Sequence, residues 1–294
     1  ALSMLVVVDV IGVMGNGSQR WLDLGFINLQ PSELMKIALV MALARYFHCL
    51  SDDDTLKLKN LIKPIILIIL PVVLVYRQPD LGTTILIAIG GITLLFAAGV
   101  RLWIFVASAV ALIPATIGFW QFLKPYQKQR ILTFLDPEKD PLGAGYHIIQ
   151  SKIALGSGGI YGKGFIQGTQ SQLNFLPEKH TDFIFTVIAE ELGLIGGLVL
   201  LLLYLILLGY AMLISISVKS QFGRLLVLGM ATTFFLYMFI NIAMVMGLLP
   251  VVGVPLPLVS YGGSAMLTLL VGFGFIFSAS IHKETYIPRG GSFA

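Results

Sequence analysis

The sequence has few charged residues, one cysteine and four histidines. Only 12% of its 294 residues are charged and 57% are hydrophobic, whereas soluble domains carry about 25% charged residues. This scarcity of charge excludes an ordinary soluble domain. The single cysteine, Cys49, excludes an internal disulfide. The histidines are scattered, with no HExxH motif and no cysteine cluster, so the sequence does not favour a zinc site.

Two further classes of protein find no support in the sequence. The net charge of +4 is ordinary for a membrane protein with basic cytoplasmic loops, so it does not indicate nucleic-acid binding. The segment Ser260-Tyr-Gly-Gly263 does not fit the GxSxG pattern of a serine hydrolase.

Long apolar runs occupy most of the chain. A helix crosses a hydrocarbon core of about 30 Å with about 20 apolar residues. We therefore predict an all-α, polytopic transmembrane helical bundle that forms a single integral membrane domain over residues 1–294, with seven full spans and one partial span. The predicted spans are 1–14 (partial), 33–49, 61–77, 82–100, 102–123, 183–216, 224–248 and 264–281.

Basic residues in the short connections predict the orientation of the spans, because Lys and Arg favour the cytoplasmic side. Alternating the spans puts all of these basic residues on one side. They are Arg45, Lys57, Lys59, Lys63, Arg101, Lys219, Arg224, Lys283 and Arg289. The remaining connections, 15–32, 78–81, 124–182 and 249–263, are then predicted to face outward.

The outer loop 124–182 is unusually long, since unstructured loops beyond about 15 residues are uncommon unless functional. Its basic residues outnumber its acidic ones. Two interpretations stay open: a solvated loop, or an anion site for a phosphate-bearing ligand. The glycine-rich segment 156–164 could offer backbone N–H groups to an anion, or its glycines could serve tight turns and close packing. It is not a nucleotide P-loop, because Ser157 stands where the first glycine would be.

A short amphipathic helix is predicted within this loop, over residues 145–156. Ile149, Ile153 and Gly156 share one stripe of this helix, and the polar residues Gln150 and Lys152 point away from it. Such a helix could lie in the plane of the membrane interface, close to a lipid-linked substrate.

Ionisable residues near the outer ends of the spans are candidates for function, because charge is costly at membrane depth. Glu33 and Lys36 share a helix face at i, i+3 spacing, either as functional groups or as a self-neutralising pair. Asp80 is predicted to cap the next outer-facing helix. Asp182 opens another span at the junction of loop and lipid. The adjacent Glu190 and Glu191 are predicted to pair with other helices.

Six motifs gather at the outer span ends and in the outer loop. They are Gln30-Pro-Ser-Glu33 with Lys36, Gln78-Pro-Asp-Leu-Gly82, Asp136 to Tyr146, Leu176 to Phe185, Ala189-Glu-Glu-Leu-Gly193 and Pro257 to Gly263. In this order they resemble the SEDS family (shape, elongation, division, sporulation), and Leu249 to Pro257 is closer to its elongation branch than to its division branch. That branch has ten spans, so the chain resembles a member without its first two helices and part of the third.

The resemblance implies an inverting peptidoglycan glycosyltransferase that polymerises lipid II into glycan strands and releases undecaprenyl diphosphate, for cell elongation and rod shape. It identifies Asp182 as the catalytic base, and Glu33 and Lys36 as further catalytic positions. Charge and location make five residues candidates for substrate binding: Arg130, Lys152 and Lys163 for the diphosphate, with His180 and Asp80.

The resemblance also implies surroundings for this activity. A divalent cation, Mg²⁺ or Mn²⁺, could share the work on the diphosphate. The expected partners are a class B penicillin-binding protein, other elongation-complex proteins and membrane lipid, but no nucleic acid. The expected location is the bacterial cytoplasmic (inner) membrane, with the active site on the extracytoplasmic face. The alternatives are a flippase or transporter for the lipid-linked precursor, and a non-catalytic scaffold.

Overall fold

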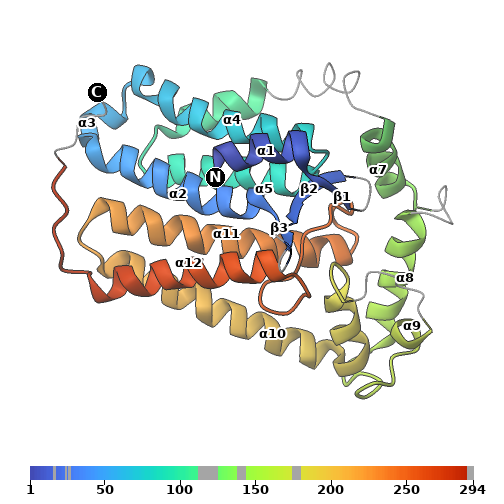
Figure 1. The fold of residues 1–294 in the computed structure, drawn as a ribbon. Coiled ribbons are helices and arrows are strands. Elements are labelled where there is room, and N and C mark those ends of the chain that lie inside the picture. The colour runs from blue at the N-terminus through green and yellow to red at the C-terminus, as the bar shows by residue number, and fades with distance from the viewer. Residues whose placement is uncertain are drawn as a thin grey trace. The chain divides into compact units, whose positions relative to one another are not determined.

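A computed structural model describes residues 1–15, 18–23, 25, 28–111, 125–137, 144–173 and 180–289 of the chain. Helices account for most of these residues (Figure 1). The helices are α1 Leu2–Ile11, α2 Pro31–Cys49, α3 Asp52–Thr55, the 3-10 helix η1 Leu58–Leu61, α4 Ile62–Arg77, α5 Leu81–Ala97, α7 Pro125–Leu135, α8 Ala144–Ser157, α9 Thr169–Gln172, α10 Ile184–Ser217, α11 Gln221–Val245 and α12 Gly263–Ile281. A further apolar helix covers Leu102–Ala111.

Four stretches of helix in the described part of the chain are long and apolar enough to cross a membrane. They are Leu58–Arg77, α10, α11 and α12. The apolar side chains of three of them largely face outward: 28% of the most apolar window is buried in Leu58–Arg77, 17% in α10 and 28% in α12, against 67% in α11. A soluble protein would hide such side chains in its core, so the chain is an integral membrane protein. The all-α polytopic prediction is thereby confirmed, while the total of seven full spans stays a prediction.

The structure divides into two compact units. The first comprises Ala1–Arg101, Leu207–Leu236 and Gly262–Ala294, and the second comprises Leu102–Ile206 and Tyr237–Tyr261. Helices α10 and α11 contribute residues to both units.

Helix α2 forms the centre of the first unit. It packs against α1, α4, α5 and α12, and its side chains Leu43, Ala44 and Phe47 are almost completely buried. A close approach of α4 and α5 supports this core, since an ideal Cβ on Gly91 of α5 would lie 2.7 Å from Cγ1 of Ile68 on α4. Because α2 is buried along its length, the charged groups that it carries are inside protein rather than in lipid.

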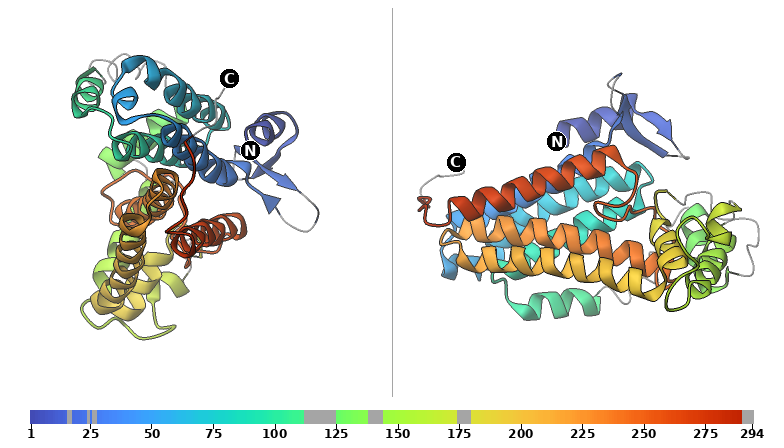
Figure 2. Two further views of the ribbon diagram at one scale, coloured as in Figure 1. Left: turned by 90° about the vertical axis from the view of Figure 1, so that its left-hand side faces the viewer. Right: turned by 90° about the horizontal axis from the view of Figure 1, so that it is seen from below.

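A small antiparallel sheet lies between α1 and α2, where we predicted only an outward connection. Strand β2 (Ser18–Asp23) pairs with β1 (Val13–Gly15) and with β3 (Asn28–Leu29). The strands lie beside α1 in Figure 2, and β2 also contacts α2, while β3 contacts α12. The sheet brings Arg20 of β2 to the start of α2 and α5.

The second unit contains the outer loop, whose described residues are largely helical. Helix α8 confirms the helix predicted over 145–156, whereas α7 was not predicted. The buried face of α8 carries Ile148, Ser151 and Ala154. The predicted stripe therefore faces away from the protein: Ile153 is 47% exposed.

Helix α10 is interrupted at Gly193, whose φ of 68° and ψ of −164° are not helical. At this point the glycine-rich segment 156–164 pairs with α10 through its backbone. The N–H groups of Lys163 and Gly164 donate to the carbonyls of Glu190 and Glu191, each at 3.0 Å. The apolar run over 183–216 predicts one continuous span and gives no signal for this interruption.

Candidate functional site

Asp182 lies one residue before Phe183, at the entry to α10, and is half-buried. Three successive backbone carbonyls at this point each accept a hydrogen bond. The His180 carbonyl accepts from the Tyr261 N–H (2.9 Å) and the Thr181 carbonyl from the Ser260 hydroxyl (2.5 Å), both in the segment that precedes α12. The Asp182 carbonyl accepts from the side-chain amide of Asn241 on α11 (2.8 Å). Three consecutive carbonyls are thus held, so the position of Asp182 is fixed by its backbone. We call these three contacts the carbonyl clamp.

The two side chains of the carbonyl clamp also hold the segment between α11 and α12. Asn241 is completely buried and its amide donates a second hydrogen bond, to the Val254 carbonyl at 2.7 Å. The Ser260 hydroxyl accepts from the Leu256 N–H at 2.8 Å. In the same segment, an ideal Cβ on Gly253 would lie 3.5 Å from Asp182 Oδ2. A glycine here leaves the space beside the carboxylate open.

Glu33 and Lys36 form a buried ion pair in the first turns of α2. Lys36 Nζ lies 2.7 Å from Glu33 Oε1, and each residue is only 4% exposed. The i, i+3 contact predicted from the spacing is confirmed. Because both groups are buried, the attraction between their opposite charges offsets part of the free-energy cost of removing them from water.

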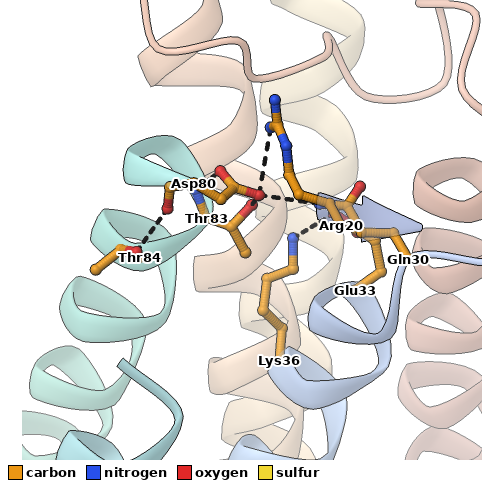
Figure 3. Close-up of polar contacts among 7 residues, drawn as sticks. All are labelled: Arg20, Gln30, Glu33, Lys36, Asp80, Thr83 and Thr84. Carbon is orange, nitrogen blue, oxygen red and sulfur yellow. Dashed lines mark hydrogen bonds and ion pairs between the residues drawn. The ribbon is translucent and has the colours of Figure 1, made fainter. Parts of the chain in front are cut away.

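Asp80 joins three elements of the first unit next to this pair (Figure 3). Its carboxylate accepts from the Thr83 N–H at 3.1 Å and the Thr83 hydroxyl at 2.8 Å, which confirms the predicted helix cap on α5. The same carboxylate accepts from the Gln30 amide at 3.0 Å and forms an ion pair with Arg20 at 3.5 Å. The Asp80 carboxylate therefore binds side chains or backbone of three elements: β2, the start of α2 and the start of α5.

Lys163 reaches the carboxylate of Glu190, which is completely buried. Its Nζ lies 2.8 Å from Glu190 Oε1 and 2.7 Å from the Thr169 hydroxyl, and the Gln170 N–H also donates to Oε1, at 2.9 Å. Glu190 is therefore paired as predicted, with a contact to helix α9 through Gln170, but its ion-pair partner Lys163 lies in the glycine-rich segment rather than on a helix. The pairing of Glu191 stays a prediction. The backbone contacts of the glycine-rich segment with α10 confirm the alternative of turns and close packing for its glycines.

The other predicted substrate ligands lie on the second unit. Lys152 and His180 are exposed, and the Lys152 stem covers Gly247. The backbone of Arg130 belongs to α7, but its side chain is outside the described residues, as are residues 124, 138–143 and 174–179 of the outer loop. The diphosphate contacts of Arg130, Lys152 and Lys163, and the expected proximity of Glu33 and Lys36 to Asp182, stay predictions.

Three residues of these clusters were missed by the sequence analysis: Arg20, Asn241 and Ser260. Arg20 gave no signal, because its role depends on strand pairing. Asn241 could have been found, since a lone amide in an apolar span usually holds a buried polar partner. Ser260 belongs to a motif that we had noted, without a role for its hydroxyl.

The described residues contain no group of three or more His, Cys, Asp or Glu side chains that could hold a metal ion. Magnesium is commonly bound by one or two carboxylates together with substrate phosphates. The expected divalent cation therefore stays a prediction.

Comparison with known proteins gives consistent results over nearly the whole chain. Residues 1–285 match the family model of the cell cycle proteins FtsW, RodA and SpoVE. The chain is 53% identical over 283 residues to the peptidoglycan glycosyltransferase MrdB of Escherichia coli (strain K12), covering 96% of this chain and 76% of that protein. It is 38% identical over 299 residues to the probable peptidoglycan glycosyltransferase FtsW of Idiomarina loihiensis, covering 99% of this chain and 72% of that protein.

Two solved structures are similar in fold. One comes from work on the structural coordination of polymerization and crosslinking by a peptidoglycan synthase complex; it gives a TM-score of 0.82 at 31% identity and covers 96% of this chain and 79% of that chain. The other is the rod shape determining protein RodA of Thermus thermophilus, with a TM-score of 0.69 at 26% identity, covering 97% of this chain and 76% of that chain.

Proposed function

Because this chain belongs to the family of the cell cycle proteins FtsW, RodA and SpoVE, we propose that it is a peptidoglycan glycosyltransferase that polymerises lipid II. The similarity to MrdB, at 53% identity over 96% of the chain, is the observation that carries this proposal. The higher identity to MrdB than to FtsW supports a role in cell elongation and rod shape.

In the proposed reaction, Asp182 is the general base. Its carboxylate takes the proton from the 4-hydroxyl of the acceptor GlcNAc as the hydroxyl oxygen attacks C1 of the donor MurNAc. The bond between C1 and the phosphate oxygen breaks, and undecaprenyl diphosphate leaves with the electron pair. Attack opposite the leaving group inverts the anomeric carbon. The carbonyl clamp supports this role, because a base must be held within hydrogen-bond reach of the proton that it removes.

The leaving diphosphate needs positive charge nearby. Arg130, Lys152 and Lys163 are the proposed ligands, with His180 beside Asp182 in sequence. Glu190 already binds Lys163, so a diphosphate contact would share this ammonium group or displace the carboxylate. We propose that the buried charges of Glu33 and Lys36 are needed for the reaction, with Asp80 holding the adjoining elements in place.

A divalent cation is proposed only as a companion of the substrate. Because magnesium is commonly bound by one or two carboxylates together with substrate phosphates, Mg²⁺ or Mn²⁺ would enter on the diphosphate and neutralise part of its charge. No step above requires it.

The surroundings of the reaction are also proposals. The similarity to a chain of a peptidoglycan synthase complex that couples polymerization to crosslinking supports a transpeptidase partner, a class B penicillin-binding protein, within an elongation complex. The apolar helices and the basic connections support a bacterial cytoplasmic (inner) membrane location with Asp182 on the extracytoplasmic side.

Polymerisation of labelled lipid II by the purified full chain with its transpeptidase partner tests the proposal. Asp182→Asn keeps the shape of the side chain but removes the base, so the rate should fall by a factor of about 10² to 10⁴. Asp54→Asn, a matched loss of an exposed carboxylate, should leave it unchanged. Equal rates for wild type and Asp182→Asn would reject Asp182 as the base. Lipid movement in vesicles without polymer from the wild type would favour a flippase.

A further inference from the structure

A cavity of about 370 Å³ lies in the first unit, at the far end of α2 from Glu33. Its wall includes His48 near the C-terminal end of α2 and the turn Ala97–Gly99 after α5. Glu33 and His48 are fifteen positions apart on one helix, which corresponds to about 22 Å at 1.5 Å per residue. The cavity is therefore separate from the cluster around Glu33 and Asp80, and belongs to the predicted cytoplasmic ends of the spans.

The C-terminal segment closes one side of the cavity. In Figure 1 this segment (red) runs from the end of α12 to the end of α2. His48 Nε2 lies 3.1 Å from the Ile287 carbonyl oxygen. Since that oxygen can only accept, Nε2 carries the proton and donates. A second hydrogen bond connects the C-terminal segment to the rest of the unit: the Lys219 backbone N–H donates to the Lys283 carbonyl at 3.1 Å.

Positive charge dominates the wall. Lys219, Arg224 and Arg289 line the cavity, and none of the described residues that line it is acidic. Arg224 lies in the first turn of α11, where the helix dipole adds partial positive charge. Glu284 pairs with Lys219 outside the wall; a hydrogen bond from Lys219 lowers the pKa of this carboxyl below its ordinary value. The wall is thus suited to an anion.

Two polar atoms at the cavity lack a hydrogen-bond partner among the described residues: His48 Nδ1 and Gln221 Oε1. Both are buried, and buried polar atoms are normally paired. Both atoms are acceptors, since His48 carries its proton on Nε2 and Oε1 is an amide oxygen. They therefore suit a donor, such as a hydroxyl group of a glycerol headgroup, while the anion itself must be bound by the basic side chains of the wall.

Exposed apolar side chains on the helices that end near the cavity favour a lipid over a free anion. Phe96, one residue before the wall residue Ala97, is 58% exposed, and Ile281, the last residue of α12, is 78% exposed. A lipid could place its headgroup in the cavity and its acyl chains along such apolar surfaces. We propose that this cavity binds the phosphate headgroup of an anionic phospholipid of the cytoplasmic leaflet. The proposal does not depend on the glycosyltransferase reaction.

Binding of fluorescent phosphatidylglycerol and phosphatidylcholine to the full chain in neutral detergent tests this site. The wild type should prefer phosphatidylglycerol at least tenfold. In Arg224→Gln/Arg289→Gln the affinity for phosphatidylglycerol should fall about tenfold or more, because charge-assisted hydrogen bonds are lost. The matched control is Lys59→Gln/Lys63→Gln, which removes two exposed basic residues on the same predicted face but outside the cavity wall.

Three results would overturn the proposal. Equal loss of affinity in the two double variants would mean general surface attraction. Equal binding of the two lipids by the wild type would mean that there is no anionic headgroup site. Displacement of phosphatidylglycerol by millimolar inorganic phosphate would mean a site for a free anion. The last two measurements use the wild type alone and do not depend on the folding of a variant.

Discussion

At the residue scale, the Glu33–Lys36 pair combines stability and chemistry in one contact. Both groups are buried, and their mutual contact of 2.7 Å offsets the cost of removing them from water. Loss of one partner leaves an uncompensated buried charge, which destabilises proteins by roughly 3 to 5 kcal/mol. A single substitution therefore cannot separate a structural role from a catalytic one.

The double variant Glu33→Gln/Lys36→Met separates them. Each single variant should lower the unfolding temperature in detergent, and the double variant should recover most of that loss, since both charges are gone. Polymerisation of lipid II should stay low in all three if the reaction needs the charges themselves. Recovery of stability and activity together in the double variant would show that the pair only neutralises itself.

Ser260 tests the carbonyl clamp. Ser260→Ala removes the donor to the Thr181 carbonyl and the acceptor for the Leu256 N–H. Because small displacements of a base are costly, we expect kcat to fall by a factor of about 10 to 10². KM should change little, since the hydroxyl is not proposed to touch substrate. Ser157→Ala, which removes an exposed hydroxyl bonded within its own helix, is the control. A kcat of wild-type size for Ser260→Ala would contradict the positioning role.

At the element scale, the membrane helices were the most predictable part of the fold. The predicted spans 61–77, 183–216 and 264–281 agree with α4, α10 and α12 to within one residue, because lipid requires long uninterrupted apolar runs. The Asp80 cap was predictable as a local contact. The β2 strand and the interruption at Gly193 were not, since both depend on backbone pairing with segments that have no periodic signal.

The junction of the glycine-rich segment with α10 gives a prediction at this scale. Gly162 has a φ of 81°, and an ideal Cβ there would lie 2.5 Å from the Glu191 carbonyl carbon. Gly159 also has a positive φ, 55°, but no atom lies within 4 Å of its ideal Cβ. Gly159→Ala should cost about 1 to 2 kcal/mol of stability from backbone strain alone.

Gly162→Ala should cost clearly more than Gly159→Ala, because the backbone of α10 must also move. Thermal unfolding in detergent measures the difference. We expect the loss of polymerisation to follow the same order, since Glu190 and Lys163 lie at this junction. Equal unfolding temperatures for the two variants would contradict a tight contact between the segment and α10.

At the scale of the whole molecule, the site was predictable only in part. Asp182, Glu33 and Lys36 stand in motifs that can be recognised without a structure. The Glu33–Lys36 contact is local and was predictable, but the contacts that hold Asp182 are long-range: Asn241 is 59 positions from Asp182, and Ser260 is 79 positions from Thr181. A sequence read along the chain shows which groups carry charge, but not which neutral side chains fix them.

Orientation in the membrane is the remaining prediction, and it applies to every site described above. Tyr161 in the glycine-rich segment is 82% exposed, and Tyr286 in the C-terminal segment is 79% exposed, so cysteines at the two positions should be similarly reactive. In a Cys49→Ser background, a membrane-impermeant maleimide should label Tyr161→Cys in intact spheroplasts. It should label Tyr286→Cys only after permeabilisation, because the basic connections favour the cytoplasm. The reverse pattern would put the outer loop in the cytoplasm and move the proposed lipid site to the opposite leaflet.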